Sequence, residues 1–270
     1  MNELISALII AVVQGLTEWM PISSSGHLIL FEKLLDYSGG LMFDVALHFG
    51  TLMAVFVYFG GDIVDIVKDF TSLNWSSENG RLGLLILIAT LPAVIVGFLF
   101  KNIFLNAFDS LGIVALGFGI TGLILLIASF QRRIKRKKLD GRTLEVGEKR
   151  FGYFDGFLVG CAQILSLFPG ISRSGATLSS GLLLGLDEKS AMKFSFLMSI
   201  PITFGANILV IGNNTLPSNL IWATLVSFGV GLLAIHLLFK HILTSRRNLK
   251  WFAIYALLLA GILGIWVGMS

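Results

Sequence analysis

One stretch of this chain occurs twice. The segment QGLTEWMPISSSGH, residues 14–27, returns as QILSLFPGISRSGA at residues 163–176. Each copy is a short polar stretch, interrupted by proline or glycine, between apolar runs. In membrane proteins, interrupted hydrophobic segments at matching positions of two halves point to the binding site. The coinciding positions are Gln14/Gln163, Leu16/Leu165, Ile22/Ile171, Ser23/Ser172, Ser25/Ser174 and Gly26/Gly175.

The composition indicates a membrane protein. Of the 270 residues, 55% are hydrophobic and 13% are charged, and the mean hydropathy is +0.86. Soluble domains carry about 25% charged residues. The net charge of +4 does not indicate a nucleic-acid partner, because nine of the twenty Lys and Arg residues fall between Arg132 and Arg150. Such clustering is typical of a cytoplasmic loop.

Hydrophobic length predicts the elements. A helix needs about 20 mostly apolar residues to cross a bilayer. Segments 1–36 and 151–186 instead hold shorter apolar stretches on either side of the repeated motif, which is typical of a helical hairpin that enters the membrane and returns on the same side. Six other segments are long enough to span: about 41–60, 82–100, 111–130, 191–211, 218–239 and 250–268.

The expected fold is therefore all-α and polytopic, with six transmembrane helices and two re-entrant hairpins in a single domain, residues 1–270. Each half, about 1–130 and 151–268, has one hairpin and three spans. Because three is odd, the halves form an inverted-topology repeat. Basic residues in loops 131–150 and 240–250 predict that both loops are cytoplasmic and both termini lie outside. The turns of the two hairpins should then meet near the midplane.

The first motif offers oxygen ligands. Gln14 and Glu18 are four residues apart and share one helix face. An ionisable residue at membrane depth is a functional candidate. Glu18 suits Mg²⁺ or Ca²⁺, and Gln14 can add a carbonyl oxygen. The alternative is a protonated Glu18 that hydrogen-bonds to a serine. Hydroxyl groups follow at Ser23, Ser24 and Ser25.

The second motif has the features of an anion site. Arg173 presents a planar fork that matches phosphate, and Gly170 permits close approach of a ligand. Ser172, Ser174 and Thr177 add hydroxyl donors near a helix start. The alternative is that Arg173 forms a purely structural ion pair with Glu18.

His27 is the titratable base beside the first motif, and we interpret it as a proton-transfer group in preference to a buried structural histidine. Asp44 and His48 lie one turn apart on the next helix, where a supporting role and a structural contact are equally plausible. A carboxylate, a divalent metal, an arginine, hydroxyls and an imidazole are the parts that phosphoryl transfer needs. A site that opens sideways into the bilayer suits a lipid phosphate, and no GxxxxGK[ST] phosphate loop occurs in the chain.

These motifs resemble those of the undecaprenyl-diphosphate phosphatases, also called bacitracin-resistance proteins. The resemblance rests on QxxxE at Gln14–Glu18, PISSSGH at Pro21–His27 and PGISRSxxT at Pro169–Thr177, and it runs over essentially the whole chain. The leading acid of the first motif is often Glu in the family and is Gln14 here, which leaves Glu18 as the main carboxylate. Ser25 stands where many members have Thr.

The resemblance implies an integral enzyme of the plasma (inner) membrane. It would hydrolyse a C55 polyprenyl diphosphate to the monophosphate and inorganic phosphate, recycle the lipid carrier for cell-envelope synthesis and confer bacitracin resistance. It also implies a Mg²⁺ or Ca²⁺ requirement and a site facing the extracytoplasmic side. Carried over by position, Glu18 binds metal or acts as base and Arg173 holds phosphate. Either Ser24 or His27 is the nucleophile, and the residues do not decide between them.

A transporter or flippase for the same lipid phosphate is the main alternative, because inverted repeats with re-entrant hairpins are also transporter architecture. A transporter would need Arg173 and the hydroxyls but neither a metal-binding Glu18 nor His27. A channel is disfavoured because no ring of like charges is evident in the sequence. The candidate partners are the polyprenyl diphosphate, the bilayer and a second copy in a homodimer.

Overall fold

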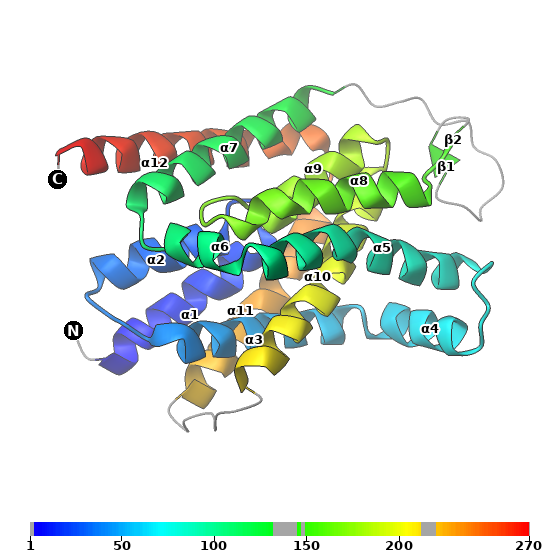
Figure 1. Cartoon of the computed structure of the whole chain (residues 1–270), viewed down its shortest axis with the longest axis horizontal. Coiled ribbons are helices and arrows are strands. Elements are labelled where there is room, and N and C mark those ends of the chain that lie inside the picture. The colour runs from blue at the N-terminus through cyan, green and yellow to red at the C-terminus, as the bar shows by residue number, and fades with distance from the viewer. Residues whose placement is uncertain (1–2, 132–144, 147–148, 212–219, 270) are drawn as a thin grey trace.

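The computed structural model of this chain describes residues 3–131, 145–146, 149–211 and 220–269. Those residues fold almost entirely into helices (Figure 1). The first half contains α1 (Glu3–Trp19), α2 (Ser24–Leu34), α3 (Gly40–Tyr58), α4 (Gly60–Thr71), α5 (Glu78–Leu99), α6 (Lys101–Ala107) and α7 (Leu111–Phe130). The second contains α8 (Tyr153–Ile164), α9 (Arg173–Leu183), α10 (Glu188–Ile211), α11 (Leu220–Leu237) and α12 (Leu249–Met269). Two antiparallel strands of two residues each, β1 (Glu145–Val146) and β2 (Lys149–Arg150), lie between the halves.

Five helical segments of the described residues are long and apolar enough to cross a membrane, and they coincide with five of the six expected spans. The sixth, 191–211, is helical as part of α10 but is not among the five. The five are Gly40–Tyr58, Glu78–Leu99, Leu111–Phe130, Leu220–Ile242 and Arg246–Met269.

Each repeated motif forms two helices joined by a short turn, as expected. In the first hairpin α1 ends at Trp19 and α2 begins at Ser24; in the second, α8 is followed by a short 3₁₀ turn and α9 begins at Arg173. We call residues 20–27 the first tip and residues 168–176 the second tip. The N- and C-terminal ends of the chain lie at one end of the molecule, and β1 and β2 lie at the other (Figure 1). Helices α4 and α6 were not expected from the sequence.

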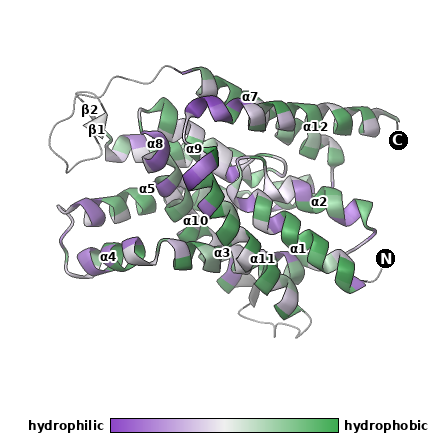
Figure 2. Ribbon diagram, turned by 180° about the vertical axis from the view of Figure 1, so that it is seen from behind, coloured by the Kyte–Doolittle hydropathy of each residue, from purple (hydrophilic) through white to green (hydrophobic). Residues whose placement is uncertain are grey.

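Large apolar side chains cover much of the outer surface, including Phe98, Phe130, Trp251 and Ile265. Hydrophobic residues run along most of α1 and α12, whereas α4 carries several hydrophilic ones (Figure 2). Exposed apolar surface on this scale marks a membrane-facing protein.

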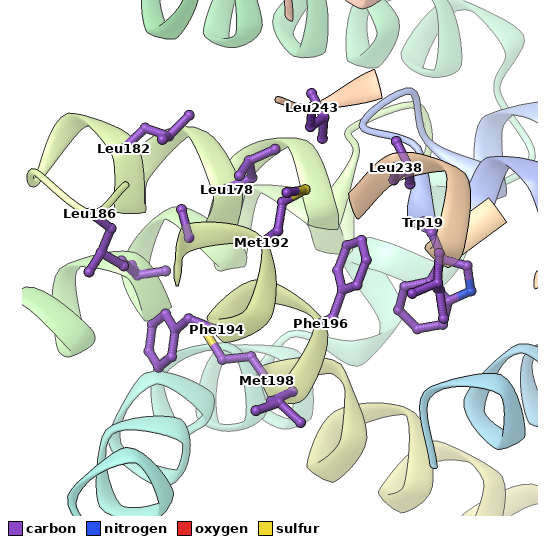
Figure 3. Close-up of a cluster of buried hydrophobic side chains, with 14 of the residues drawn as sticks. Trp19, Leu178, Leu182, Leu186, Met192, Phe194, Phe196, Met198, Leu238 and Leu243 are labelled. Carbon is purple, nitrogen blue, oxygen red and sulfur yellow. The ribbon is translucent and has the colours of Figure 1, made fainter. Parts of the chain in front are cut away.

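A buried aromatic cluster fixes the end of α1 beside the first tip. Trp19 is 2% exposed, and its ring lies 4.9 Å from that of Phe196 on α10. Figure 3 places Phe196 between Trp19 and Met192, in a cluster that extends to Leu182 of α9. Because Glu18 precedes Trp19 in α1, the same packing fixes the backbone from which the Glu18 side chain extends.

Candidate active site

The two tips share one local design. Ser23 and Ser172 are the N-caps of α2 and α9, and each side chain accepts a hydrogen bond from the backbone N–H three residues later. Such caps satisfy amide groups that a helix start leaves unpaired. Each cap hydroxyl also lies 3.2 Å from the hydroxyl two residues on, Ser25 or Ser174. The repeated Ser-x-Ser-Gly pattern therefore builds both helix starts.

The tips contact each other directly. The Ser174 hydroxyl donates to the Met20 carbonyl at 3.0 Å. A Cβ added at Gly26 would lie 3.0 Å from the Gly170 Cα, and one added at Gly175 would lie 3.3 Å from the Pro21 carbonyl oxygen. These small residues bring the two helix starts together inside the protein.

Glu18 is the centre of the hydrogen-bond network between the tips. Ser24 Oγ donates to its Oε2 at 2.6 Å, and Gln14 Nε2 donates to the same oxygen at 3.1 Å. Arg173 Nη2 donates to Oε1 at 2.5 Å, and His48 Nε2 lies 3.6 Å from Oε2. Four of these residues come from the first half, and only Arg173 comes from the second.

The guanidinium of Arg173 has one terminal nitrogen in a hydrogen bond and the other without a partner among the described residues. Its guanidinium carbon lies 5.9 Å from the centre of the Trp19 ring, a cation–π distance. Nη2 binds Glu18, whereas the buried Nη1 has no partner among the described residues. One face of the fork therefore retains donor capacity for an anion.

A cavity of about 380 Å³ opens beside this network. Glu18, Ser23, Ser24, Ser25, Ser172 and Arg173 line it, as do apolar side chains such as Ile29, Leu167 and Ile202. Asp44, His48, Gln163 and Asn207 contribute further polar groups. An anionic headgroup and an apolar chain would both find suitable surfaces here.

Two acidic side chains, Glu32 near the C-terminal end of α2 and Asp44 of α3, line the cavity. Glu32 lies outside the candidate spans. Partial burial, together with the neighbouring Asp44, raises the pKa of Glu32 to about 7.

His27 is the last residue of the first tip and does not line the cavity. Its Nδ1 donates to the Ser23 carbonyl at 2.6 Å, because a carbonyl oxygen only accepts. Its Nε2 lies 2.7 Å from the Tyr255 hydroxyl of α12, and its ring meets the edge of Phe118. In this arrangement the imidazole holds the tip in place.

Other expected site residues surround the network without lining the cavity. Thr177 Oγ1 donates to the Arg173 carbonyl and lies 2.6 Å from Ser195 Oγ. Gly170 adopts a φ of +86°, and its carbonyl accepts from Thr121 Oγ1 at 2.9 Å. Gln14 reaches the site through its bond to Glu18.

Sequence reasoning missed several of the groups now seen around the tips. Thr121 of α7 also accepts from the Ser172 backbone N–H at 2.9 Å, and Tyr255 contacts His27. Neither lies in a repeated motif, so nothing in the pattern singled them out. The repeat pairs Gln163 with Gln14, but the sequence pattern indicated no role for Gln163.

The oxygen groups suit a hard divalent cation, although the described residues contain no cluster of three or more His, Cys, Asp and Glu side chains that could hold a metal. Glu18 and Asp44 supply carboxylates to the cavity wall. Buried carbonyl oxygens of Gln14 and Asn207 have no partner among the described residues. Carboxylate and carbonyl oxygens are the ligands that Mg²⁺ and Ca²⁺ prefer, so the residues fit the cation chemically.

These features together define a multi-pass membrane protein with a carboxylate, an arginine and several hydroxyls gathered in an internal cavity. Comparison with known proteins gives the family. The family model described as bacitracin resistance protein BacA matches residues 7–262, and the chain belongs to that family.

Several relatives extend the match along the full chain. It is 38% identical to a protein of Thermosipho africanus over 97% of this chain and 99% of the relative. It is 39% identical to one from Caldicellulosiruptor bescii, with 95% of each chain covered. It is 35% identical to one from Methanococcus maripaludis, over 93% of this chain and 95% of the relative. All three relatives bear the name undecaprenyl-diphosphatase.

Proposed function

We propose that this protein hydrolyses undecaprenyl diphosphate to undecaprenyl monophosphate and inorganic phosphate. The reaction recycles the lipid carrier of cell-envelope synthesis and so provides resistance to bacitracin, in keeping with the family description and the names of the relatives. The observation that carries the proposal is the Ser24–Glu18–Arg173 network on the wall of a largely apolar cavity.

Ser24 is the proposed nucleophile. Its hydroxyl donates to Glu18 Oε2 at 2.6 Å, which is the geometry of a nucleophile beside its base. Ser24 Oγ attacks the terminal phosphorus while Glu18 takes its proton, and the bond from that phosphorus to the bridging oxygen breaks. The lipid monophosphate leaves, and water then hydrolyses the phosphoserine. His27 is less suited to attack, because both of its nitrogens are already engaged.

Arg173 and the hydroxyls hold the phosphate groups. The free Nη1 of Arg173 can donate to a phosphoryl oxygen while Nη2 exchanges Glu18 for the substrate. Ser23, Ser25 and Ser172 line the same cavity and can donate further hydrogen bonds. Gly170, Ser174 and Thr177 then support the phosphate-binding turn, through the contacts that fix the second tip.

A divalent cation, Mg²⁺ or Ca²⁺, is part of the proposal. Glu18 would hold it, with the Gln14 carbonyl as a further oxygen ligand, and Asp44 lines the same cavity. When bound, the cation would neutralise charge on the diphosphate.

The proposed membrane arrangement has six spans, with α10 as the sixth, and two re-entrant hairpins in an inverted repeat. Both termini would be outside, and the site would face the extracytoplasmic side. The position of the chain ends opposite β1 and β2 supports this (Figure 1), as does the basic loop 131–150. A cysteine introduced at 131–150 in a Cys161→Ala background should resist impermeant reagents added outside intact cells; labelling there would overturn the orientation.

A transporter of polyprenyl phosphate is the second candidate, favoured by the midplane position that the inverted repeat predicts for the tips. It would not require Ser24 to donate to a carboxylate. A homodimer remains a prediction, which sedimentation of the purified protein in detergent can test.

The deciding experiment measures phosphate release from a polyprenyl diphosphate by purified protein, with and without Mg²⁺ or Ca²⁺. We expect metal-dependent release that Glu18→Ala and Arg173→Ala abolish. Thermal unfolding controls for folding, because breaking a buried ion pair costs about 3–5 kcal/mol. Absence of release from a folded wild-type protein that binds the lipid would favour the transporter.

A further inference from the structure

Gln163 is a buried polar side chain to which the proposed mechanism gives no task. It lies in the last turn of α8, is 1% exposed and lines the cavity that holds Glu18 and Arg173. Its position is fixed one turn earlier, where a Cβ at Gly160 would lie only 2.3 Å from the Ala89 carbonyl oxygen of α5. Close packing of the two helices therefore leaves Gln163 little freedom to turn elsewhere.

Both polar atoms of this side chain are unpartnered. Neither Nε2 nor Oε1 of Gln163 has a hydrogen bond to any described residue. A buried donor or acceptor without a partner costs about 1–3 kcal/mol. Its counterpart in the repeat, Gln14, differs, because the Nε2 of Gln14 donates to Glu18. The second copy keeps the carboxamide but lacks the acid, since position 167 is leucine.

The unpartnered donors of the cavity point to one ligand chemistry. Two lie among the residues that line the cavity, Gln163 Nε2 and Arg173 Nη1. A diphosphate presents many acceptor oxygens and can satisfy both at once. We propose that Gln163 is a substrate-binding residue whose Nε2 donates to a phosphoryl oxygen beside Arg173. The identity of the lipid rests on the proposed function, whereas recognition of a diphosphate does not.

The test compares three variants. Gln163→Met keeps the size of the side chain but removes both polar ends, and Gln163→Glu keeps the shape but replaces the donor with a negative charge. Ser179→Ala is the matched control, because the Ser179 hydroxyl is also buried without a partner but does not line the cavity. Each variant is purified at full length in detergent with the divalent cation present.

Two measurements distinguish the proposed role of Gln163 from the proposed phosphatase activity. The first is the concentration of inorganic diphosphate that stabilises the protein against heat; the second is KM and kcat for phosphate release from polyprenyl diphosphate. We expect Gln163→Met to weaken diphosphate binding and to raise KM by roughly ten- to a hundredfold, the size of one hydrogen bond to a charged group. Its melting temperature without ligand should equal or exceed that of the wild type. Gln163→Glu should bind diphosphate more weakly still. Ser179→Ala should match the wild type in diphosphate binding and in KM.

Unchanged diphosphate binding and KM in Gln163→Met would overturn the assignment and leave a structural carboxamide. A Gln163→Glu variant that binds diphosphate as tightly as the wild type and needs less cation would also overturn it, in favour of a metal ligand. Failure of the phosphatase proposal looks different: the wild type would release no phosphate, while diphosphate binding would still weaken in Gln163→Met.

Discussion

The two tips have the same backbone design and different chemistry. Both begin a helix with a capping serine and a second serine two residues later. Where the first copy has Glu18 the second has Leu167, and where the second has Arg173 the first has Ser24. The carboxylate of Glu18 and the hydroxyl of Ser24 thus come from the first half, and the guanidinium of Arg173 comes from the second. The comparison teaches that the repeat supplies the backbone scaffold, and that the acid and the arginine of the proposed site stand at positions where the copies have diverged.

The tips are also anchored differently. The second tip is held by backbone contacts with α7, where the Gly170 carbonyl and the Ser172 N–H both bond Thr121. The first tip is held by a side chain, through His27 and Tyr255 of α12. Its cap also lies in an unfavourable region, since Ser23 has φ 69° and ψ 98°. In the second tip the positive φ falls on Gly170, which tolerates it.

The largest expected effect is on phosphate release. It should distinguish positions at which the two copies of the motif differ from positions at which they have the same residue. Ser24→Ala and Arg173→Lys change the corresponding diverged positions. Ser24→Ala removes the proposed nucleophile and should abolish measurable phosphate release, and Arg173→Lys should lower it by about 10²- to 10³-fold. Ser25→Ala and Ser174→Ala change the corresponding shared positions and should lower it by less than about tenfold, the weight of one ordinary hydrogen bond. Initial rates at saturating lipid, corrected for folded protein, test this. Equal losses at all four positions would contradict the division of roles.

A smaller effect tests the backbone anchor of the second tip. A Cβ at Gly117 would lie 2.3 Å from the Pro169 carbonyl oxygen, whereas one at Gly119 would meet its nearest neighbour, Ala260, at 3.8 Å. Gly117→Ala should therefore destabilise the protein by about 1–3 kcal/mol through overpacking. Gly119→Ala on the same helix should be neutral or slightly stabilising. Thermal unfolding in detergent measures both, and similar melting temperatures would argue against a tight contact between α7 and this tip.

The smallest effect concerns the caps. Replacing a capping serine by glycine costs only a few tenths of a kcal/mol. At Ser23 this loss of stability is offset, because a positive φ costs a non-glycine residue about 1–2 kcal/mol and glycine removes that strain. We expect Ser23→Gly to unfold at the same or a higher temperature than the wild type, and Ser172→Gly at a slightly lower one. The reverse order of unfolding temperatures would show that the two tips do not differ in backbone strain.

Much of this architecture was predictable because apolar length and repetition are strong signals. Five expected spans coincide with α3, α5, α7, α11 and α12, and the pairing of Glu18 with Arg173 was among the alternatives considered. Helix α4 was missed because its twelve residues are too short and too polar for a span. Tyr255 was missed because its role depends on His27, which lies 228 positions away in the chain. Asn207 was missed because only the folded chain brings it to the cavity that Glu18 and Arg173 line. The part of loop 131–150 at residues 132–144 and 147–148 lies outside the described residues.

The bond between His27 and Tyr255 has a consequence for how the protein is made. Its two partners are 228 positions apart, and Tyr255 lies on α12, the last helix of the described chain. Because synthesis runs from the N-terminus, the first hairpin is made long before Tyr255. The first tip therefore reaches its final arrangement only after α12 has been inserted. A chain that ended before α12 would lack this contact on the first tip.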